Sequence, residues 1–329
     1  MVQIFLDGQA YDCGPGENVL DALLRQDVAL SFSCKKGVCQ SCLMKVDAGE
    51  APAAAQEGLR DTLREQGYFL PCVCRPSTAL KISRPDDAAA YLPARVLAVE
   101  PLAETIRRVF FEPSAAFQYR AGQFVNMRRR DGLARTYSLA TVPGQEPFPG
   151  VDVKLMPGGR MSNWVFDGLT PGTVLDIQGP NGACYYVPDR PDQPILMIGN
   201  GSGLGALAAI ARDALAQGHT GPIDLYHGTR YPAGLYLRGE LALLAETAAN
   251  FRYHPCVSGP EAGDGQRAAR ADDAAFADHP DLTGRRIFLC GHAPMVNGAK
   301  RAAYLAGADL ADIYADPYEL QDRRHDHAA

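Results

Sequence analysis

Two short runs with apolar residues, separated by a turn signal, make up the first thirteen positions of the chain. The runs VQIFLDG and QAYDC are typical of two short strands, and Asp7-Gly8 between them is a hairpin turn signal. In ENVLDALLRQ the apolar residues recur at the spacing of one helix face, at Val19, Leu20, Leu23 and Leu24. LMKV, after a cysteine-rich loop, reads as a further strand. We therefore predict one small α+β unit over residues 1–84.

The middle of the chain, residues 94–188, contains short β-rich runs broken by glycine and proline. These runs are RVLAVE, RRVFFE, GQFVNM, RTYSLA, VDVKLM and TVLDIQG. Several strands at short, regular spacing predict an antiparallel barrel. The preceding stretch RPDDAAAYLP is polar and rich in proline and alanine, so we place a linker at residues 85–93.

The pattern changes after residue 188, where strands alternate with helices. ILMIG leads through a glycine loop into an alanine-rich helix that ends near Gly218. Further strands are predicted at IDLYHG, FRYHP and RRIFLCG, and further helices at LRGELALLAETAA and MVNGAKRAAYLAG. This alternation predicts a parallel α/β sheet over residues 189–320. Residues 321–329 read as a solvated tail, in which a frayed terminus is favoured over a metal site at His325 and His327.

Composition places the chain among soluble globular proteins, because 47% of its residues are hydrophobic and 21% are charged. Its 329 residues suit two or three domains. A net charge of −6 argues against nucleic acid or an anionic membrane as the main partner. The start lacks the pattern of a signal peptide, and GNGSG interrupts the one long uncharged stretch, 193–211. We expect a cytoplasmic protein without membrane insertion.

Three of the nine cysteines are crowded into CKKGVCQSC, residues 34–42. Half of a disulfide framework, a zinc site and an iron–sulfur site are the competing interpretations. A disulfide framework is disfavoured without a secretory signal, and zinc usually takes two C-x2-C pairs. The spacing C-x4-C-x2-C, followed by a distant fourth cysteine, is that of plant-type [2Fe–2S] clusters. The sequence therefore favours the iron–sulfur interpretation.

The predicted cluster ligands are Cys34, Cys39, Cys42 and Cys72. Cys74 stays open as an alternative to Cys72, because residues two apart in an extended strand point the same way. Gly37 and Ser41 are small enough to let the backbone approach a cluster closely. We expect Cys13, Cys184 and Cys256 to be small buried apolar residues.

The order of these segments resembles a plant-type [2Fe–2S] ferredoxin domain fused to a ferredoxin–NADP reductase-like flavoprotein. This is the arrangement of the reductase components of bacterial multicomponent oxygenases. The similarity extends from Val2 to about Tyr318. It implies an α+β ferredoxin (β-grasp) domain at 1–84, an FAD-binding antiparallel β-barrel domain at 94–188 and an NAD(P)-binding α/β parallel-sheet domain at 189–320.

Two segments of the middle third resemble the flavin motifs of this family. By the resemblance to R-x-Y-S, Arg135 contacts the FAD phosphates, Tyr137 lies against the flavin ring, and Ser138 reaches the ring nitrogen that accepts hydride. In GGRMSNWV, Gly159 and Ser162 open a helix whose N–H groups can bind a phosphate. Ordinary surface packing and an ordinary helix cap are the alternatives for these two motifs.

The glycine loop GNGSGLGA stands between a strand and a helix, where a dinucleotide pyrophosphate would bind. Its candidate residues are Gly199, Gly201 and Gly203. The second strand ends at HGTR without the usual acidic residue, so Arg230 either accepts the 2′-phosphate of NADPH or stacks on adenine. The family mostly uses NADH, which the resemblance therefore favours.

The segment CGHAPM resembles the family's C-G-P-P-x-M segment, which implies that Cys290 and Gly291 lie beside the nicotinamide. His292 stands where the family has its first proline. Tyr318 matches a C-terminal aromatic residue that packs near the flavin. A buried cysteine at a strand end is the alternative for Cys290.

These features together imply an NAD(P)H:acceptor oxidoreductase with a [2Fe–2S] cluster, FAD and NADH, with NADPH as the alternative. A flavin holds one or two electrons, so it can join a two-electron donor to a one-electron cluster. The expected acceptor is the oxygenase component of an aromatic-ring dioxygenase or a related monooxygenase. The alternatives are a deoxysugar dehydratase as partner and a redox sensor without turnover. The basic run at 128–130 is either a solvated strand end or a docking site for an acidic partner.

Overall fold

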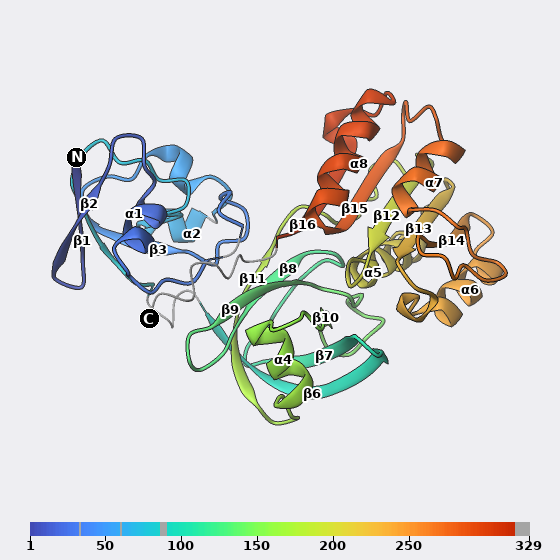
Figure 1. The fold of residues 1–329 in the computed structure, drawn as a ribbon, viewed down its shortest axis with the longest axis horizontal. Helices are drawn as coiled ribbons and strands as arrows, with labels where there is room; N and C mark the ends of the chain where they lie inside the picture. Colours follow the sequence, from blue (N-terminus) through green and yellow to red (C-terminus); the bar gives the residue numbers. More distant parts are fainter. Residues whose placement is uncertain (33, 60, 86–90, 320–329) are drawn as a thin grey trace.

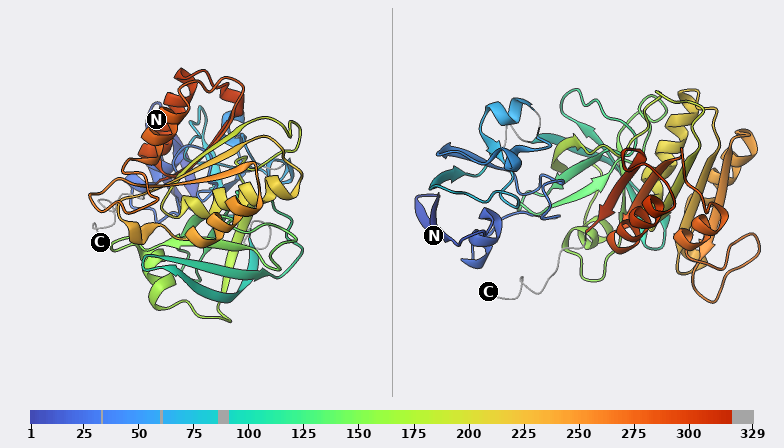
Figure 2. Two further views of the ribbon diagram at one scale, coloured as in Figure 1. Left: turned by 90° about the vertical axis from the view of Figure 1, so that its right-hand side faces the viewer. Right: turned by 90° about the horizontal axis from the view of Figure 1, so that it is seen from above.

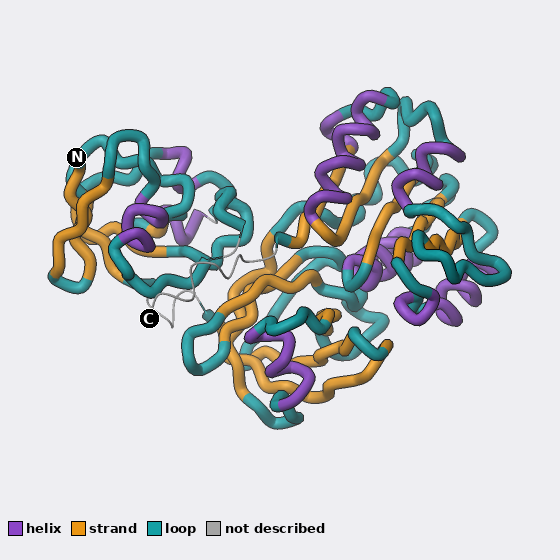
Figure 3. Tube along the Cα trace, viewed as in Figure 1, coloured by secondary structure: helices purple, strands orange, loops and turns teal. Residues whose placement is uncertain are grey.

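The computed structural model describes residues 1–32, 34–59, 61–85 and 91–319. Three sheets follow one another along the chain (Figure 1), and Figure 2 shows the same succession from two further directions. In Figure 3 helices accompany the first and last sheets, whereas the middle one consists mostly of strands. The fold class predicted from the sequence is confirmed in all three parts.

The first part is a five-stranded sheet in the order β2-β1-β5-β3-β4. The predicted hairpin is present, with Leu6 opposite Gln9 and positive φ angles of 51° at Asp7 and 81° at Gly8. The predicted helix begins after Asn18, whose side chain accepts the Asp21 N–H at 2.8 Å. The elements are β1 (Val2–Leu6), β2 (Gln9–Cys13), α1 (Val19–Arg25), β3 (Met44–Ala48), α2 (Asp61–Glu65), β4 (Tyr68–Phe69) and β5 (Leu80–Ser83).

The second part is a six-stranded antiparallel sheet in the order β10-β7-β6-β11-β8-β9. A bridge between Leu139 and Val151 brings its two edges together, so the sheet curls into the predicted barrel. The first strand begins at Leu92, inside the range predicted as a linker, and residues 86–90 lie outside the described residues. The elements are β6 (Leu92–Ala103), β7 (Ile106–Pro113), β8 (Phe124–Arg128), β9 (Ala134–Ser138), β10 (Gly150–Lys154), α4 (Arg160–Asp167) and β11 (Val174–Asn181).

The third part is a parallel sheet in the order β14-β13-β12-β15-β16. Apolar residues of α5 and α6 form one core with it, and those of α7 and α8 form a second core on its other face. The elements are β12 (Ile195–Asn200), α5 (Gly203–Ala216), β13 (Ile223–Thr229), α6 (Arg238–Thr247), β14 (Phe251–Val257), α7 (Ala271–Asp278), β15 (Arg286–His292), α8 (Ala293–Leu305) and β16 (Ile313–Tyr318).

In the third part α7 and β16 were not predicted, and in the first part α2, β4 and β5 were not predicted. β16 contains Pro317, which lowers its strand propensity, but β16 is an edge strand, where proline is tolerated. The predicted tail, with His325 and His327, falls outside the described residues. Among the residues that the structure does describe, no helix has the length and apolar character needed to cross a membrane.

A buried ion pair of the barrel is connected to the third part through the hydroxyl of Tyr236. Arg108 in β7 donates two hydrogen bonds to Asp152 in β10, at 2.6 and 3.0 Å. Tyr236 Oη donates to the same carboxylate at 3.1 Å and accepts the N–H of Gly205 at 2.8 Å. A Cβ on Gly205 would lie 2.0 Å from Asp152 Oδ2. Glycine at this position therefore allows α5 to approach the barrel.

Candidate active site

The four predicted ligand cysteines gather as two hydrogen-bonded pairs, Cys34 with Cys39 and Cys42 with Cys72. Backbone N–H groups of Lys36 and Cys39 each donate to Cys34 Sγ at 3.3 Å. The N–H of Cys34 donates to Cys39 Sγ at 3.4 Å. The loop and the segment around Cys72 thus form two sulfur pairs with backbone donors directed at them, which is the environment that an iron–sulfur group requires.

Each pair contains one sulfur that ionises readily. The hydrogen bond from the Cys39 thiol and the backbone donors lower the pKa of Cys34 to about 5. The same bond, together with burial, raises the pKa of Cys39. In the second pair, the bond from Cys42 lowers the pKa of Cys72, whereas that bond and burial raise the pKa of Cys42. Thiolates are the ligand form of cysteine, so the loop is prepared for a soft metal.

The arrangement in two pairs fits a two-iron group better than a single zinc ion. Within the described residues no group of three or more histidine, cysteine or acidic side chains is placed to hold one metal ion. Tetrahedral zinc needs four ligands around one centre. A [2Fe–2S] group has two centres, and each can take one cysteine pair.

Cys72 and Cys74 diverge. Residues 71–73 form a turn rather than the extended strand that the sequence analysis assumed, so the two thiols leave the chain in different directions. Cys72 joins the apolar cluster that contains Cys42, whereas Cys74 is fully buried in the cluster that contains Cys13. Burial raises the pKa of Cys74 to about 12.

Small residues keep the loop close to this turn. Gly37 has a φ of +77°, and a Cβ there would lie 3.2 Å from both methyl carbons of Val73. The N–H of Gly37 donates to the sulfur of Cys72. The Ser41 hydroxyl lies 2.8 Å from Cys39 Sγ. The other cysteines that we expected in apolar surroundings, Cys13, Cys184 and Cys256, are buried.

The first flavin motif lies on β9. Arg135 and Tyr137 are half-buried, and burial raises the pKa of the Tyr137 hydroxyl. Ser138 is buried at the end of the strand. A guanidinium, an aromatic ring and a hydroxyl in succession match the phosphate, ring and nitrogen of a flavin nucleotide.

An acidic residue that the sequence analysis missed lies next to this motif. Ser138 Oγ donates to Asp316 Oδ2 at 2.5 Å. Burial raises the pKa of the Asp316 carboxyl to about 6. In the sheet register Asp316 is opposite Cys290, and burial followed by the charge of Asp316 raises the pKa of Tyr318. Residues of three strands therefore gather at one place: Ser138 from β9, Cys290 from β15, and Asp316 and Tyr318 from β16. An acid inside the apolar run IYADPY was the signal that could have revealed it.

The predicted nucleotide glycines form the turn between β12 and α5. A Cβ on Gly203 would lie 2.5 Å from the carbonyl oxygen of Cys290, so glycine lets α5 begin against the end of β15. Gly201 has a φ of +54°. Gly291, with a φ of +130°, passes so close to Asn200 that a Cβ would lie 2.2 Å from Asn200 Oδ1. The positive end of α5 thus lies beside the predicted nicotinamide segment.

Gly199 and Arg230 complete the predicted nucleotide site. Gly199 is paired with Cys290 across the sheet. Arg230 follows β13 and is exposed. Because parallel strands end at the same edge, Arg230 lies one strand away from the glycine turn.

The second flavin motif opens α4. Gly159 caps this helix, and the Ser162 hydroxyl accepts the Met156 N–H at 3.1 Å and donates to the Gly159 carbonyl at 3.3 Å. The hydroxyl therefore fixes the turn. The helix terminus itself remains the part of this motif that suits a phosphate.

The basic run at 128–130 is only partly exposed, because the side chains of Arg128 and Arg129 are half-buried. Arg128 pairs with Asp176 at 2.9 Å, and Arg129 pairs with Asp131 at 2.9 Å. Arg130 is exposed.

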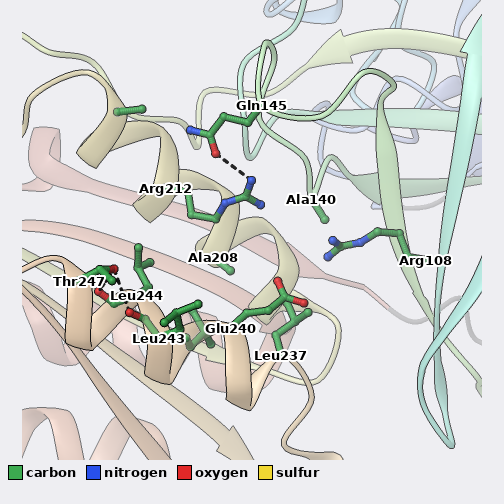
Figure 4. Close-up of a pocket in the computed structure, with 12 residues that line it drawn as sticks. Arg108, Ala140, Gln145, Ala208, Arg212, Leu237, Glu240, Leu243, Leu244 and Thr247 are labelled. Atoms are coloured by element: carbon green, nitrogen blue, oxygen red, sulfur yellow. Dashed lines mark hydrogen bonds between the residues drawn. The ribbon is translucent and has the colours of Figure 1, made fainter.

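A cavity of about 390 Å³ lies between the barrel and the helices α5 and α6 (Figure 4). Arg108 and Arg212 face it from two sides. Leu237, just before α6, and Glu240 in α6 close it. Among the described residues that line it, none belongs to the predicted flavin or nucleotide motifs. The predicted site is therefore separate from this cavity.

Comparisons with known proteins agree with this division of the chain. The family described as "2Fe-2S iron-sulfur cluster binding domain" matches residues 4–77. The "Oxidoreductase FAD-binding domain" matches residues 94–186, and the "Oxidoreductase NAD-binding domain" matches residues 197–301.

Relatives are similar over almost the whole chain. The reductase subunit of an aromatic O-demethylase from an Amycolatopsis species is 33% identical, over 91% of this chain and 93% of that protein. The ferredoxin–NAD(P)+ reductase component of the naphthalene 1,2-dioxygenase system of Pseudomonas putida is 31% identical, over 92% and 94%. The crystal structure of the Amycolatopsis cytochrome P450 reductase GcoB superposes with a TM-score of 0.69 at 31% identity, covering 97% of this chain and 99% of that one.

The fold and the site together define an NAD(P)H-dependent oxidoreductase that uses a [2Fe–2S] cluster, FAD and NAD(P)H. More closely, the chain belongs to the family of ferredoxin-containing reductase components of bacterial oxygenase systems.

Proposed function

We propose that this protein takes hydride from NADH in the cytoplasm and delivers single electrons to an oxygenase component. Several relatives are named as reductase components of dioxygenase or monooxygenase systems. The observation that carries the proposal is the convergence of four cysteine sulfurs, a flavin motif and a nucleotide turn in one chain. Nine free cysteines suit a reducing compartment.

In this proposal Cys34 and Cys39 hold one iron of the cluster, and Cys42 and Cys72 hold the other. Support comes from the two hydrogen-bonded pairs and from the different core in which Cys74 is buried. Backbone donors to Cys34 Sγ stabilise negative charge on the sulfur.

Arg135 and the N-terminus of α4 hold the FAD phosphates, and Tyr137 lies against the ring. FAD supplies a carrier that accepts two electrons together and releases them one at a time. Ser138 and Asp316 hold a proton between them, because the hydroxyl donates to a carboxyl whose pKa lies near 6. Tyr318 and Cys290 enclose the same place and exclude water.

The turn at Gly199, Gly201 and Gly203 holds the NADH pyrophosphate, and Cys290 with Gly291 positions the nicotinamide. The close approach of α5 to the end of β15 supports this assignment. Arg230 at the sheet edge contacts the adenosine part.

The test compares two electron acceptors in wild type and in Cys39→Ser. Ferricyanide accepts electrons from a reduced flavin, whereas cytochrome c tests passage through the cluster. Wild type should reduce both with NADH and should contain iron and inorganic sulfide. Cys39→Ser should lose the visible cluster absorption and cytochrome c reduction but keep most ferricyanide activity. Wild type without iron and sulfide, or a variant that loses both activities, would contradict the proposal.

A further inference from the structure

A buried group of amide side chains lies where the ferredoxin domain meets the barrel. Asn126 in β8 is 0% exposed, and its Nδ2 donates to the carbonyl oxygen of Cys39 at 2.6 Å. The same nitrogen donates to Gln178 in β11. Gln178 donates to Gln40 at 3.0 Å, and Gln40 donates to the carbonyl of Gly58 at 3.0 Å. Asn126 therefore connects two strands of the barrel to the cysteine loop.

The same side chain is bonded to the strand that carries the flavin motif. Asn126 stands opposite Thr136 in the pairing of β8 with β9, and Thr136 Oγ1 donates to Asn126 Oδ1 at 2.7 Å. Thr136 stands between Arg135 and Tyr137. Two hydrogen bonds through one side chain thus join the Cys39 carbonyl to the flavin strand.

Two further polar contacts of the ferredoxin domain, among the described residues, lie at the rim of this boundary. Ser31 Oγ donates to the Gly132 carbonyl at 3.0 Å, and Lys36 pairs with Glu319; both contacts are exposed to water. Exposed polar pairs contribute little to the stability of an interface, because water competes for both partners. A buried carbonyl oxygen that loses its donor cannot bond to water instead. Loss of this hydrogen bond therefore costs more stability than loss of an exposed one. The orientation of the cysteine loop therefore depends on Asn126 more than on the rim.

We propose that Asn126 is a positioning residue that holds the cluster loop against the flavin strand and thereby sets the rate of electron transfer from flavin to cluster. The inference rests on the proposed function, because it takes Cys39 as a cluster ligand and Tyr137 as a flavin contact. Transfer between two cofactors slows as they separate. Hydride transfer from NADH takes place at Cys290 and Ser138 and does not depend on the loop.

The experiment uses the holoprotein in anaerobic stopped-flow mixing with NADH, which resolves flavin reduction from the later reduction of the cluster. In Asn126→Ala the cluster step should slow at least about tenfold, as expected for a buried carbonyl left without its donor. Flavin reduction should stay within about twofold of wild type. The matched control is Thr141→Ala, which removes another fully buried polar side chain of the barrel, bonded to Tyr119 and the Gly150 N–H.

A second readout does not depend on turnover. Hydrogen–deuterium exchange of the cysteine-loop amides, 36–43, should increase in Asn126→Ala and remain unchanged in Thr141→Ala, with iron content retained in both. Asn126→Leu, which keeps a similar size and removes the donor, should behave like the alanine variant and replaces it if that variant does not fold. A wild-type cluster rate in a folded donor-less variant, or equal slowing of both steps, would overturn the inference. A wild-type protein without iron, sulfide or NADH-dependent flavin reduction would instead overturn the proposed function.

Discussion

Burial shifts the titration of the Asp316 carboxyl toward neutral pH, and the hydrogen bond from Ser138 opposes this shift. The pKa of Asp316 is raised to about 6 from an ordinary value of 3.8 by burial. Between these values the folded protein binds a proton that the unfolded chain releases. The free energy of unfolding must therefore fall as pH rises through this window.

Asp316→Asn should remove this dependence, because asparagine does not titrate. We expect the thermal midpoint of the variant to rise relative to that of wild type between about pH 4.5 and 7, by scanning calorimetry at matched pH. A difference between the two midpoints that stays constant over this range would show that Asp316 titrates normally. The pH profile of NADH-dependent ferricyanide reduction should likewise lose an inflection near pH 6.

Serine substitutions at Cys72 and Cys74 separate a cluster ligand from a core residue. Cys72→Ser should lose the visible absorption and the electron paramagnetic resonance signal of the reduced cluster. Cys74→Ser should keep both and lose only stability, about 1 kcal/mol, because a hydroxyl replaces an apolar thiol in the core. The reverse result would make Cys74 the fourth ligand.

The spacing of the cysteines could be read from the sequence because three of them lie in one short loop. The choice between Cys72 and Cys74 could not, since it depends on a turn at 71–73 that the segment FLPCVCRP does not reveal. The contacts of Asp316 and Asn126 could not be predicted from the sequence for a related reason. Their partners lie 178 and 87 residues away along the chain, and no local pattern records such contacts.

At the scale of elements, helix α5 approaches the barrel only because its first turn contains glycine. Gly205→Ala would place a methyl group on the Asp152 carboxylate and disturb its ion pair with Arg108. We expect a loss of about 3 kcal/mol in the free energy of unfolding, from overpacking and a disrupted buried pair.

Gly298→Ala in α8 is the matched control, because a Cβ at this helical position meets nothing within 4 Å. It should stabilise the protein by roughly 0.5–1 kcal/mol, since alanine is the better helix former. Scanning calorimetry of Gly205→Ala and Gly298→Ala measures both changes in stability. Equal changes in the free energy of unfolding at the two positions would mean that the close approach of α5 to Asp152 does not affect stability.

Elements with a strong period were predictable, whereas weakly patterned ones were not. The apolar run of β12 and the alanine-rich run of α5 predict a strand–helix unit from the local sequence alone. β16 is a six-residue edge strand with a proline and an acid, and its strand character comes from pairing with β15. The barrel was predicted as a class, but its closure through Leu139 and Val151 depends on pairing over distance.

At the scale of the whole molecule, the cofactors fix how many electrons the protein can hold. FAD takes two and a [2Fe–2S] cluster takes one, so anaerobic titration with dithionite should end at about 1.5 two-electron equivalents per protein. Cys39→Ser should end at about one equivalent, because only the flavin remains. Optical titration against protein concentration measures both. An end point of one in a wild-type protein with full iron content would contradict the coupling of the two centres.

The pairing of Ser138 with Asp316 also has a consequence for protein synthesis. Ribosomes add about 5–20 residues per second, so the 178 residues between the two partners take about 10 to 40 s to translate. The barrel strands β10 and β11 are translated early in this interval, whereas β16 of the parallel sheet is translated only at its end. We therefore expect fragments that stop before β16 to bind FAD weakly and to be recovered colourless.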